Sequence, residues 1–287
     1  MHDESPPGVR GATGSVPNLR DLGGWPVRGG GCVRRGQVFR SASLADIDQA
    51  GLRALTGLGV RTVFDLRSED ERAAQPDRVP PRADLVAVDV FGEGAKTAFG
   101  LPAEMQGALP ADLSGLLSHP REALEALGGG RAAGMLVQVY RAIVTLPSAR
   151  AAYGAMFAAL ADEERRPALF HCATGKDRAG WSAAALLMLL GVSDADVMTD
   201  YLLSNEQLVP AVQPLVDRFA AAGGDPDMLR QVLGARPEYL EAALEEMASS
   251  YGTIERYFEE GLGLDPERLF ALRTALTDRD GAGTKAL

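Results

Sequence analysis

Residues 167–180 read Pro-Ala-Leu-Phe-His-Cys-Ala-Thr-Gly-Lys-Asp-Arg-Ala-Gly. The run 167–171 is short and almost wholly apolar, and helical patterns precede it at 149–162 and follow it at 179–190. A helix, a buried strand, a loop and a second helix in this order are typical of an α/β fold with a parallel sheet. They place the intervening loop at the carboxyl end of a strand, where such sheets bind their ligands.

The loop itself carries Cys172, Gly175, Lys176 and Arg178. A cysteine between a strand and a helix start lies among backbone N–H groups that bind a tetrahedral oxyanion, and their partial positive charge favours the nucleophilic thiolate. Gly175 allows the backbone to turn without a Cβ clash. Arg178 can direct two donors onto phosphate oxygens, and Lys176 adds a compact positive charge at the mouth. The loop therefore predicts an oxyanion site beside a cysteine nucleophile.

The pattern His-Cys-x-x-Gly-Lys-x-Arg-x-Gly resembles the Cys-x5-Arg signature of the protein tyrosine phosphatase superfamily. Four further segments resemble one bacterial branch of it, the tyrosine-phosphatase-like family typified by the mycobacterial secreted phosphatase B. They are Asn-Leu-Arg-Asp-Leu-Gly-Gly at 18–24, Val-Phe-Arg-Ser-Ala at 38–42, Thr-Val-Phe-Asp-Leu-Arg-Ser at 62–68 and Asp-Tyr-Leu-Leu-Ser-Asn at 200–205. The resemblance extends from about residue 18 to about residue 208.

This resemblance implies a tyrosine-phosphatase-like α/β fold, with a central, mostly parallel sheet flanked by helices. It also implies a phosphoric monoester hydrolase, with EC 3.1.3.48 as the closest class, that uses no metal and no cofactor. Cys172 would attack phosphorus and Arg178 would bind the equatorial oxygens, with Lys176 beside them. The remaining oxygens would be held by the loop amides, which belong to Ala173, Thr174 and Gly175.

A general acid must protonate the leaving oxygen. The resemblance makes Asp177 the first candidate and Asp65 the second, and the place of Asp177 between two cationic residues favours it. His171 is expected to be buried and to orient the loop, whereas Arg20 and Asp21 are candidates for residues that border the site. Asp65 and Arg67 are expected either to serve the site or to form a structural ion pair.

One position departs from the superfamily pattern. The residue after the arginine is usually Ser or Thr, whose hydroxyl assists breakdown of the phosphocysteine, and here it is Ala179. We therefore expect slow dephosphorylation of the intermediate. The alternative from another functional class is a phosphate-binding pseudophosphatase with little turnover. A nucleotide-binding loop is excluded, because Phe170 and Asp177 stand where it needs Gly and Ser or Thr.

Composition limits the partners and the compartment. The 39 acidic and 29 basic residues give a net charge of −10, the wrong sign for nucleic-acid binding. Only two cysteines occur, Cys32 and Cys172, and we find neither a secretory signal nor a membrane span, so a cytoplasmic protein is expected, with leaderless secretion left open. The expected substrates are phosphorylated proteins, phosphoinositides or small phosphorylated metabolites, and no partner protein is predicted.

The rest of the chain is organised as a tail at 1–16 and a single domain at 17–280, with a helical lid region at about 205–262. Buried strands are expected at 60–66 and 85–90, and paired strands within 18–41. Helices are expected at 44–58 behind a Ser43 cap and at 111–127, 135–146, 197–216, 228–233, 237–251 and 266–276.

Overall fold

A parallel sheet extended by one antiparallel strand forms the centre of the protein. The structure is a computed structural model, and it describes residues 7, 16–92, 125 and 128–278. In spatial order the strands are β1 (Arg20–Asp21), β3 (Val38–Ser41), β6 (Ala168–His171), β4 (Thr62–Asp65) and β5 (Asp84–Ala87). β1 pairs antiparallel with β3, and the other neighbours pair parallel, with His171 of β6 opposite both Ser41 and Asp65. The carboxyl ends of β3, β6 and β4 therefore meet at one edge.

Alternating side chains cover the two faces of this sheet with different cores. On one face Phe39, Val63 and Leu169 pack against Leu55 of helix α1 (Gln49–Gly57). On the other face Val38, Phe64 and Phe170 join the large helical core. Because successive strand residues point to opposite faces, this register places Arg40 on the helical face and Asp65 and His171 on the α1 face.

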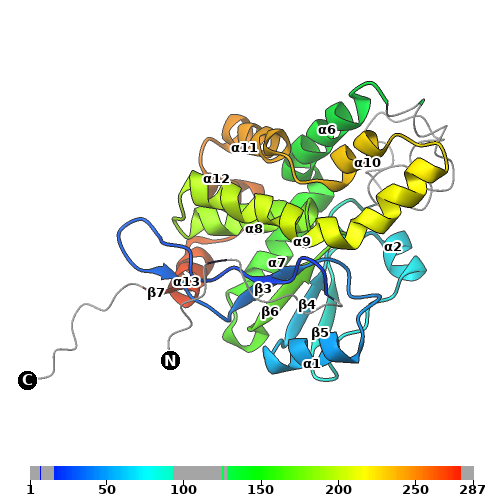
Figure 1. Cartoon of the computed structure of the whole chain (residues 1–287). Coiled ribbons are helices and arrows are strands. Elements are labelled where there is room, and N and C mark those ends of the chain that lie inside the picture. The colour runs from blue at the N-terminus through cyan, green and yellow to red at the C-terminus, as the bar shows by residue number, and fades with distance from the viewer. Residues whose placement is uncertain (1–6, 8–15, 93–124, 126–127, 279–287) are drawn as a thin grey trace, which may run out of the picture.

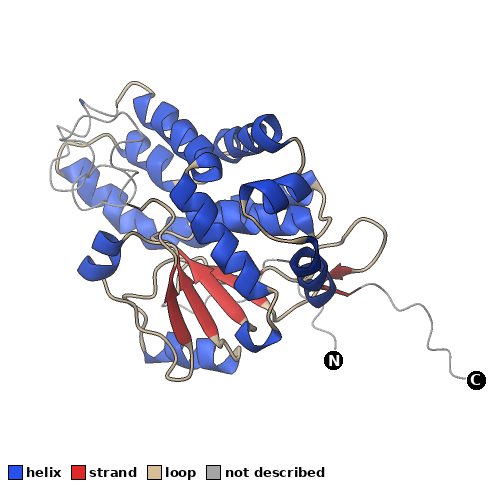
Figure 2. Cartoon of the chain, turned by 180° about the vertical axis from the view of Figure 1, so that it is seen from behind, coloured by secondary structure: helices blue, strands red, loops and turns tan. Residues whose placement is uncertain are grey.

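Most of the helices lie on one side of the sheet, and α1 lies on the other (Figures 1 and 2). A buried helix, α8, follows β6 after the loop at 172–177, and the long α9 packs against it. The described helices besides α1 are α2 (Glu69–Ala74), α6 (Arg131–Thr145), α7 (Pro147–Leu160), α8 (Arg178–Leu189), α9 (Asp194–Ala221), α10 (Pro226–Leu233), α11 (Pro237–Tyr251), α12 (Ile254–Arg256) and α13 (Pro266–Leu276).

The observed elements match most of the expected ones and differ at specific points. Helices α11 and α13 have the expected bounds, but α1 begins after Asp48, whose side chain accepts from the Gly51 amide, and not after Ser43. The expected buried strand at 85–90 is the edge strand β5, in which Leu85 is 45% exposed. An apolar run predicts a strand, but the sequence does not show whether that strand will lie at the centre or at the edge of the sheet.

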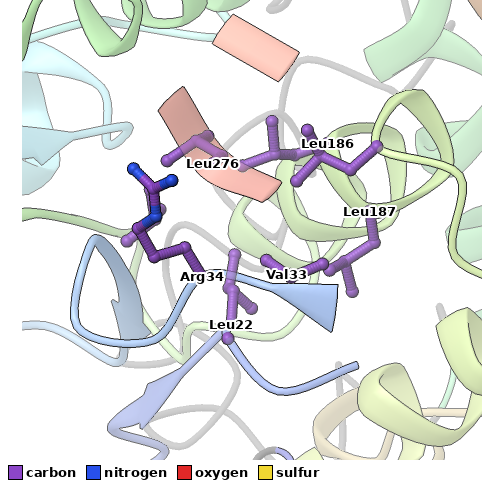
Figure 3. Close-up of a pocket in the computed structure, with 9 residues that line it drawn as sticks. Leu22, Val33, Arg34, Leu186, Leu187 and Leu276 are labelled. Carbon is purple, nitrogen blue, oxygen red and sulfur yellow. The ribbon is translucent and has the colours of Figure 1, made fainter. Parts of the chain in front are cut away.

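Short strands at the two ends of the domain also pair. β2 (Cys32–Val33) pairs antiparallel with β7 (Thr277–Asp278), whereas the two expected strands within 18–41 pair as β1 and β3. Leu276 and Val33 line a small crevice with Leu22 and Leu186 (Figure 3), and this crevice has no room for a ligand. Residue 16 is buried, but the expected tail before it and the expected helix at 111–127 lie almost wholly outside the described residues.

No single helix in the described part of the chain is long and apolar enough to cross a membrane. The pair α6 and α7, which meet at a 59° bend, passes the same test of length and composition when taken together. Both helices bury side chains such as Tyr140 and Tyr153 within the protein core.

Candidate active site

The loop between β6 and α8 lies at the carboxyl edge of the sheet. Cys172 follows the last residue of β6 and is 1% exposed, and α8 begins at Arg178. Gly175 has φ +70°, and a Cβ there would lie 2.2 Å from the carbonyl oxygen of Ser41. Both the left-handed backbone and this close approach to β3 require glycine. The loop is thus packed tightly against the end of the neighbouring strand.

Arg178 is fixed by a carboxylate from α2. Its Nη1 and Nη2 donate to the two carboxylate oxygens of Glu71 at 2.6 and 2.8 Å, and the guanidinium lies 5.0 Å from the Phe91 ring centroid. Burial disfavours the charged guanidinium, but Glu71 outweighs it and raises the pKa of Arg178 above its ordinary value. Burial likewise opposes ionisation of Glu71, yet Arg178 holds the pKa of that carboxyl below its ordinary value. Arg178 is therefore permanently charged and held in a set orientation, as a group that binds an anion must be.

Lys176 was expected to place its positive charge at the mouth of the loop, but its side chain is buried and binds α10 instead. Its buried ammonium donates to the carbonyl oxygens of Val232, at 2.6 Å, and Gly234, at 3.0 Å. These carbonyls close the C-terminal turn of α10, where a cation is favourable. The same ammonium lies 3.2 Å from Oδ1 of Asp177. Lys176 thus links the loop to α10.

Asp177 stands at the N-cap position of α8, but its side chain makes no capping hydrogen bond. Its carboxylate faces a buried pair of hydroxyls, those of Tyr140 and Tyr201, whose oxygens lie 2.7 Å apart. Burial, followed by the nearby Asp177 carboxylate, raises the pKa of Tyr140 well above its ordinary value. These tyrosines therefore stay protonated and can act as hydrogen-bond donors.

A buried charge cluster lies below the loop on the α1 face. Nε2 of His171 is 2.9 Å from Oδ2 of Asp77, and its Nδ1 is 3.3 Å from the carbonyl oxygen of Cys172. Arg67 contacts carboxylate oxygens of both Asp65 and Asp77 at 2.8 Å. Burial alone would raise the pKa of Asp77, but the hydrogen bond and charge of His171, together with Arg67, lower it to about 2.

Asp65, Asp77 and His171 also offer three ligand atoms within 4.8 Å of one another. The guanidinium of Arg67 already supplies positive charge to both carboxylates, so a metal ion at this point would be repelled. Asp65 additionally accepts from the Arg67 backbone N–H at 3.0 Å and from Nε at 2.9 Å. We assign the cluster to support of the loop and not to metal binding.

A second charge cluster lies on the helical face. Asp200 of α9 accepts from Nε of Arg20 at 3.0 Å and from Nη1 of Arg40 at 2.7 Å, with all three side chains almost fully buried. Burial opposes ionisation of Asp200, but the two arginines hold its pKa below the ordinary value. Asp21 points elsewhere, because its oxygens accept the backbone N–H groups of Gly23 and Gly36. Of the two candidates Arg20 and Asp21, Arg20 is therefore the one that joins the charge cluster around Asp200.

The superfamily's hydroxyl after the arginine is absent at Ala179, and the nearest hydroxyls in the sequence are those of Ser182 and Thr174. Ser182 donates to the carbonyl oxygen of Arg178 at 3.0 Å, a bond within α8. Thr174 is half-buried within the loop. Ala179 itself is fully buried in the main core. The position after the arginine therefore carries no hydroxyl.

Sequence reasoning placed Cys172, Lys176, Asp177 and Arg178 in one loop, and the structure has them there. It missed Glu71, although Ser68 and Glu71 form a capping box with a recognisable Ser-x-x-Glu spacing. It also missed the roles of three other buried groups, which are Asn18, Arg40 and Asp77. Asn18 and Arg40 belong to segments that the resemblance had marked, whereas Asp77 carried no signal in the sequence.

The known proteins that this chain resembles are named as phosphatases. Residues 12–278 match the sequence model of a group described as the tyrosine phosphatase family. A putative tyrosine-protein phosphatase of Cupriavidus necator is 30% identical over 260 residues, covering 89% of this chain and 85% of that protein. The triple specificity protein phosphatase PtpB of Mycobacterium tuberculosis is 29% identical over 244 residues, covering 79% and 86%. A tyrosine-protein phosphatase of Nostoc commune is 26% identical over 243 residues, covering 83% and 73%.

Proposed function

This chain belongs to the tyrosine phosphatase family, and on that premise we propose that it hydrolyses phosphomonoesters through a phosphocysteine intermediate on Cys172. It is a phosphoric monoester hydrolase of the protein tyrosine phosphatase type. The observation that carries the mechanism is the loop itself, in which Cys172 ends β6 and Arg178 begins α8. A thiolate and a guanidinium at the two ends of one anion-binding loop can hold and attack the same phosphoryl group.

In the first step the thiolate sulfur of Cys172 attacks phosphorus. The S–P bond forms while the bond from phosphorus to the ester oxygen breaks, and Arg178 and the loop amides bind the nonbridging oxygens. Asp177 gives its proton to the leaving oxygen, so that a neutral phenol or alcohol departs. In the second step water attacks phosphorus, the S–P bond breaks, and Asp177 takes the proton from that water. The products are inorganic phosphate and the regenerated thiolate.

Asp177 is a better candidate for the acid than Asp65. The carboxylate of Asp65 is already bound by three donor groups of Arg67 and lies on the α1 face below the loop. Asp177 lies within the loop and does not spend its carboxylate on capping α8. Asp177 therefore lies where a leaving oxygen at the loop can be reached, whereas Asp65 is held by Arg67 below it.

The relatives' names guide the choice of substrates. One relative is described as a triple specificity phosphatase and two as tyrosine-protein phosphatases. We propose phosphotyrosine proteins first, and phosphoserine proteins, phosphoinositides or small phosphorylated metabolites as the other classes. Dependence on a reduced Cys172, which is a free cysteine here, fits the cytoplasm as the proposed compartment.

Hydrolysis of p-nitrophenyl phosphate in the presence of a chelator tests the mechanism. We expect turnover by the wild type, none by Cys172→Ser, and mass-spectrometric trapping of one phosphoryl group on Cys172 of the wild type. Asp177→Asn should lose far more activity towards phenyl phosphate than towards p-nitrophenyl phosphate, since the better leaving group needs less protonation. Full activity of Cys172→Ser, or chelator-sensitive turnover, would refute the cysteine mechanism. Tight phosphate binding without turnover would indicate the pseudophosphatase.

A further inference from the structure

The carbonyl oxygens of the loop at 173–176 are held by hydrogen bonds from a distant part of the chain. Loop amides that point inward to an oxyanion leave the carbonyl oxygens of the same peptides pointing into the protein, where each needs a donor. The four consecutive carbonyl oxygens at 173–176 each accept a hydrogen bond from such a donor. The bonds are Ser43 N–H to Ala173 (3.1 Å), Asn18 Nδ2 to Thr174 (3.0 Å), Arg40 Nη2 to Gly175 (2.7 Å) and Arg40 Nη2 to Lys176 (3.5 Å).

We infer that Asn18 and Arg40 are positioning residues of the phosphatase reaction, which hold the loop carbonyls towards the protein interior so that the amides face the phosphate position before substrate binds. The inference rests on the proposed function, because it concerns the same loop. All the donors come from residues 18–43, which lie far from the loop in the chain. This arrangement gives the segments 18–24 and 38–42 a shared role in catalysis.

Arg40 can hold the loop firmly because Asp200 fixes one of its two terminal nitrogens while the other binds the loop. Nη1 donates to Asp200 at 2.7 Å while Nη2 donates to Gly175, so the planar guanidinium bridges α9 and the loop. Burial, with the charge of Arg20, lowers the pKa of Arg40 to about 10, and it therefore remains charged at neutral pH. A charged donor makes a stronger hydrogen bond to a carbonyl than a neutral one does.

Asn18 is oriented by a second arginine. Its Oδ1 accepts from Nη1 of Arg20, so its amide nitrogen is the end that faces Thr174. Its φ is 59°, a left-handed conformation that asparagine tolerates better than most residues. Arg20 is itself bound to Asp200. One buried carboxylate on α9 thus stabilises both positioning residues.

Three variants separate positioning from general stability. Asn18→Asp keeps the shape of the side chain but sets an oxygen against the Thr174 carbonyl. Asn18→Gly suits the positive φ and removes both the donor to Thr174 and the acceptor of Arg20 Nη1, while the carboxylate of Asp200 and its two arginines are retained. Arg40→Lys keeps the charge, but one ammonium cannot reproduce the fork that joins Asp200 to Gly175. Arg34→Lys is the matched control, because Arg34 pairs with Asp278 on the surface.

The measurements are the thermal midpoint, the Kd of orthovanadate, and kcat and KM for p-nitrophenyl phosphate. We expect each folded variant to bind vanadate at least ~10-fold more weakly and to lose about 10- to 100-fold in kcat/KM, as a misplaced binding loop would. The control should match the wild type. A purely structural role would lower the midpoint and leave the vanadate Kd of the folded protein unchanged.

The inference is overturned if folded Asn18→Gly and Asn18→Asp bind vanadate and turn over substrate within twofold of the wild type. This result would leave the proposed function intact, because the wild type remains active. If the wild type itself neither binds vanadate nor hydrolyses an aryl phosphate, the proposed function fails and the inference fails with it. Should Arg40→Lys not fold, the two Asn18 variants still decide the question, since they leave the Arg40 and Asp200 pair in place.

Discussion

Both carboxylate oxygens of Glu71 bind the guanidinium of Arg178, at 2.6 and 2.8 Å. The same carboxylate accepts the backbone N–H of Ser68 at 2.8 Å, and the Ser68 hydroxyl accepts from the Glu71 N–H in return. The N-terminus of the short helix α2 therefore sets the orientation of Arg178, the arginine that we propose binds phosphate. Nη1 and Nη2 face Glu71, and Nη1 also donates to the carbonyl oxygen of Leu66 at 3.4 Å, so Nε and the second hydrogen of Nη2 are the donors left to bind an anion.

We predict that Glu71→Gln weakens catalysis and stability together. Loss of the carboxylate charge leaves Arg178 buried without its partner, which should cost about 3–5 kcal/mol of unfolding free energy. A loosened guanidinium should reduce kcat/KM for p-nitrophenyl phosphate by about 10- to 100-fold. Inorganic phosphate should restore part of the lost stability, because it replaces the missing negative charge.

Glu69→Gln is the control, since Glu69 is exposed in the same turn of α2. Its stability and kinetics should be those of the wild type. Wild-type kinetics in a folded Glu71→Gln protein would show that Arg178 needs no partner to find its position.

We predict that the absence of a hydroxyl at residue 179 slows breakdown of the phosphocysteine. Stopped-flow hydrolysis of p-nitrophenyl phosphate should show a burst of p-nitrophenol equal to the enzyme concentration, followed by slower turnover. Ala179→Ser should reduce the burst and raise kcat. A burst-free time course with the wild type would contradict this prediction. Ala179 is fully buried, so a serine there can disturb the core. The comparison therefore requires that the thermal midpoint of Ala179→Ser stay near that of the wild type.

We predict that Asp77 makes stability fall at acid pH. Its pKa in the folded protein is about 2, against an ordinary value of 3.8. The ionised form therefore stabilises the fold above about pH 4, and this contribution, on the order of 2 kcal/mol, is lost as the pH falls through about 2. The acidic groups Glu71 and Asp200, whose pKa values are also lowered, act in the same direction.

Urea unfolding from pH 6 to pH 2.5 measures this effect. Asp77→Asn should be less stable than the wild type at pH 6, and the difference should shrink towards pH 2.5. Asp46→Asn, at an exposed position before α1, should run parallel to the wild type. A constant difference between Asp77→Asn and the wild type across the range would rule out the ionised carboxylate as the stabilising group.

We predict that Lys176→Met loosens α10. The ammonium binds the carbonyls of Val232 and Gly234, and a hydrogen bond from a charged group contributes about 1.5–3 kcal/mol. Amide hydrogen exchange in residues 226–233 should become about 10-fold faster or more. Arg230→Met is the matched control, because Arg230 forms an exposed pair with Asp227 that contributes little. Unchanged exchange in Lys176→Met would mean that apolar packing alone holds α10.

The local features of this protein could be predicted from sequence. The order of strand, loop and helix around Cys172, the family and the mostly parallel sheet follow from short-range patterns. Errors occurred where a property depends on neighbours in space. The strand at 84–87, for example, lies at the edge of the sheet. A second error was local, because α1 begins five residues later than expected, where Asp48 and not Ser43 caps it. Neither fact is written in the hydrophobic pattern.

The amino-acid sequence by itself determined which groups are candidates for the chemistry, since a Cys-x5-Arg loop places its thiol, amides and guanidinium within one short segment. Only the tertiary structure decided what holds those groups. Arg178 is bound by Glu71, 107 residues away, and the carbonyl of Gly175 is bound by Arg40, 135 residues away. Buried charges and carbonyls must find partners wherever the packed sheet and helices bring them together, and sequence spacing does not encode that meeting.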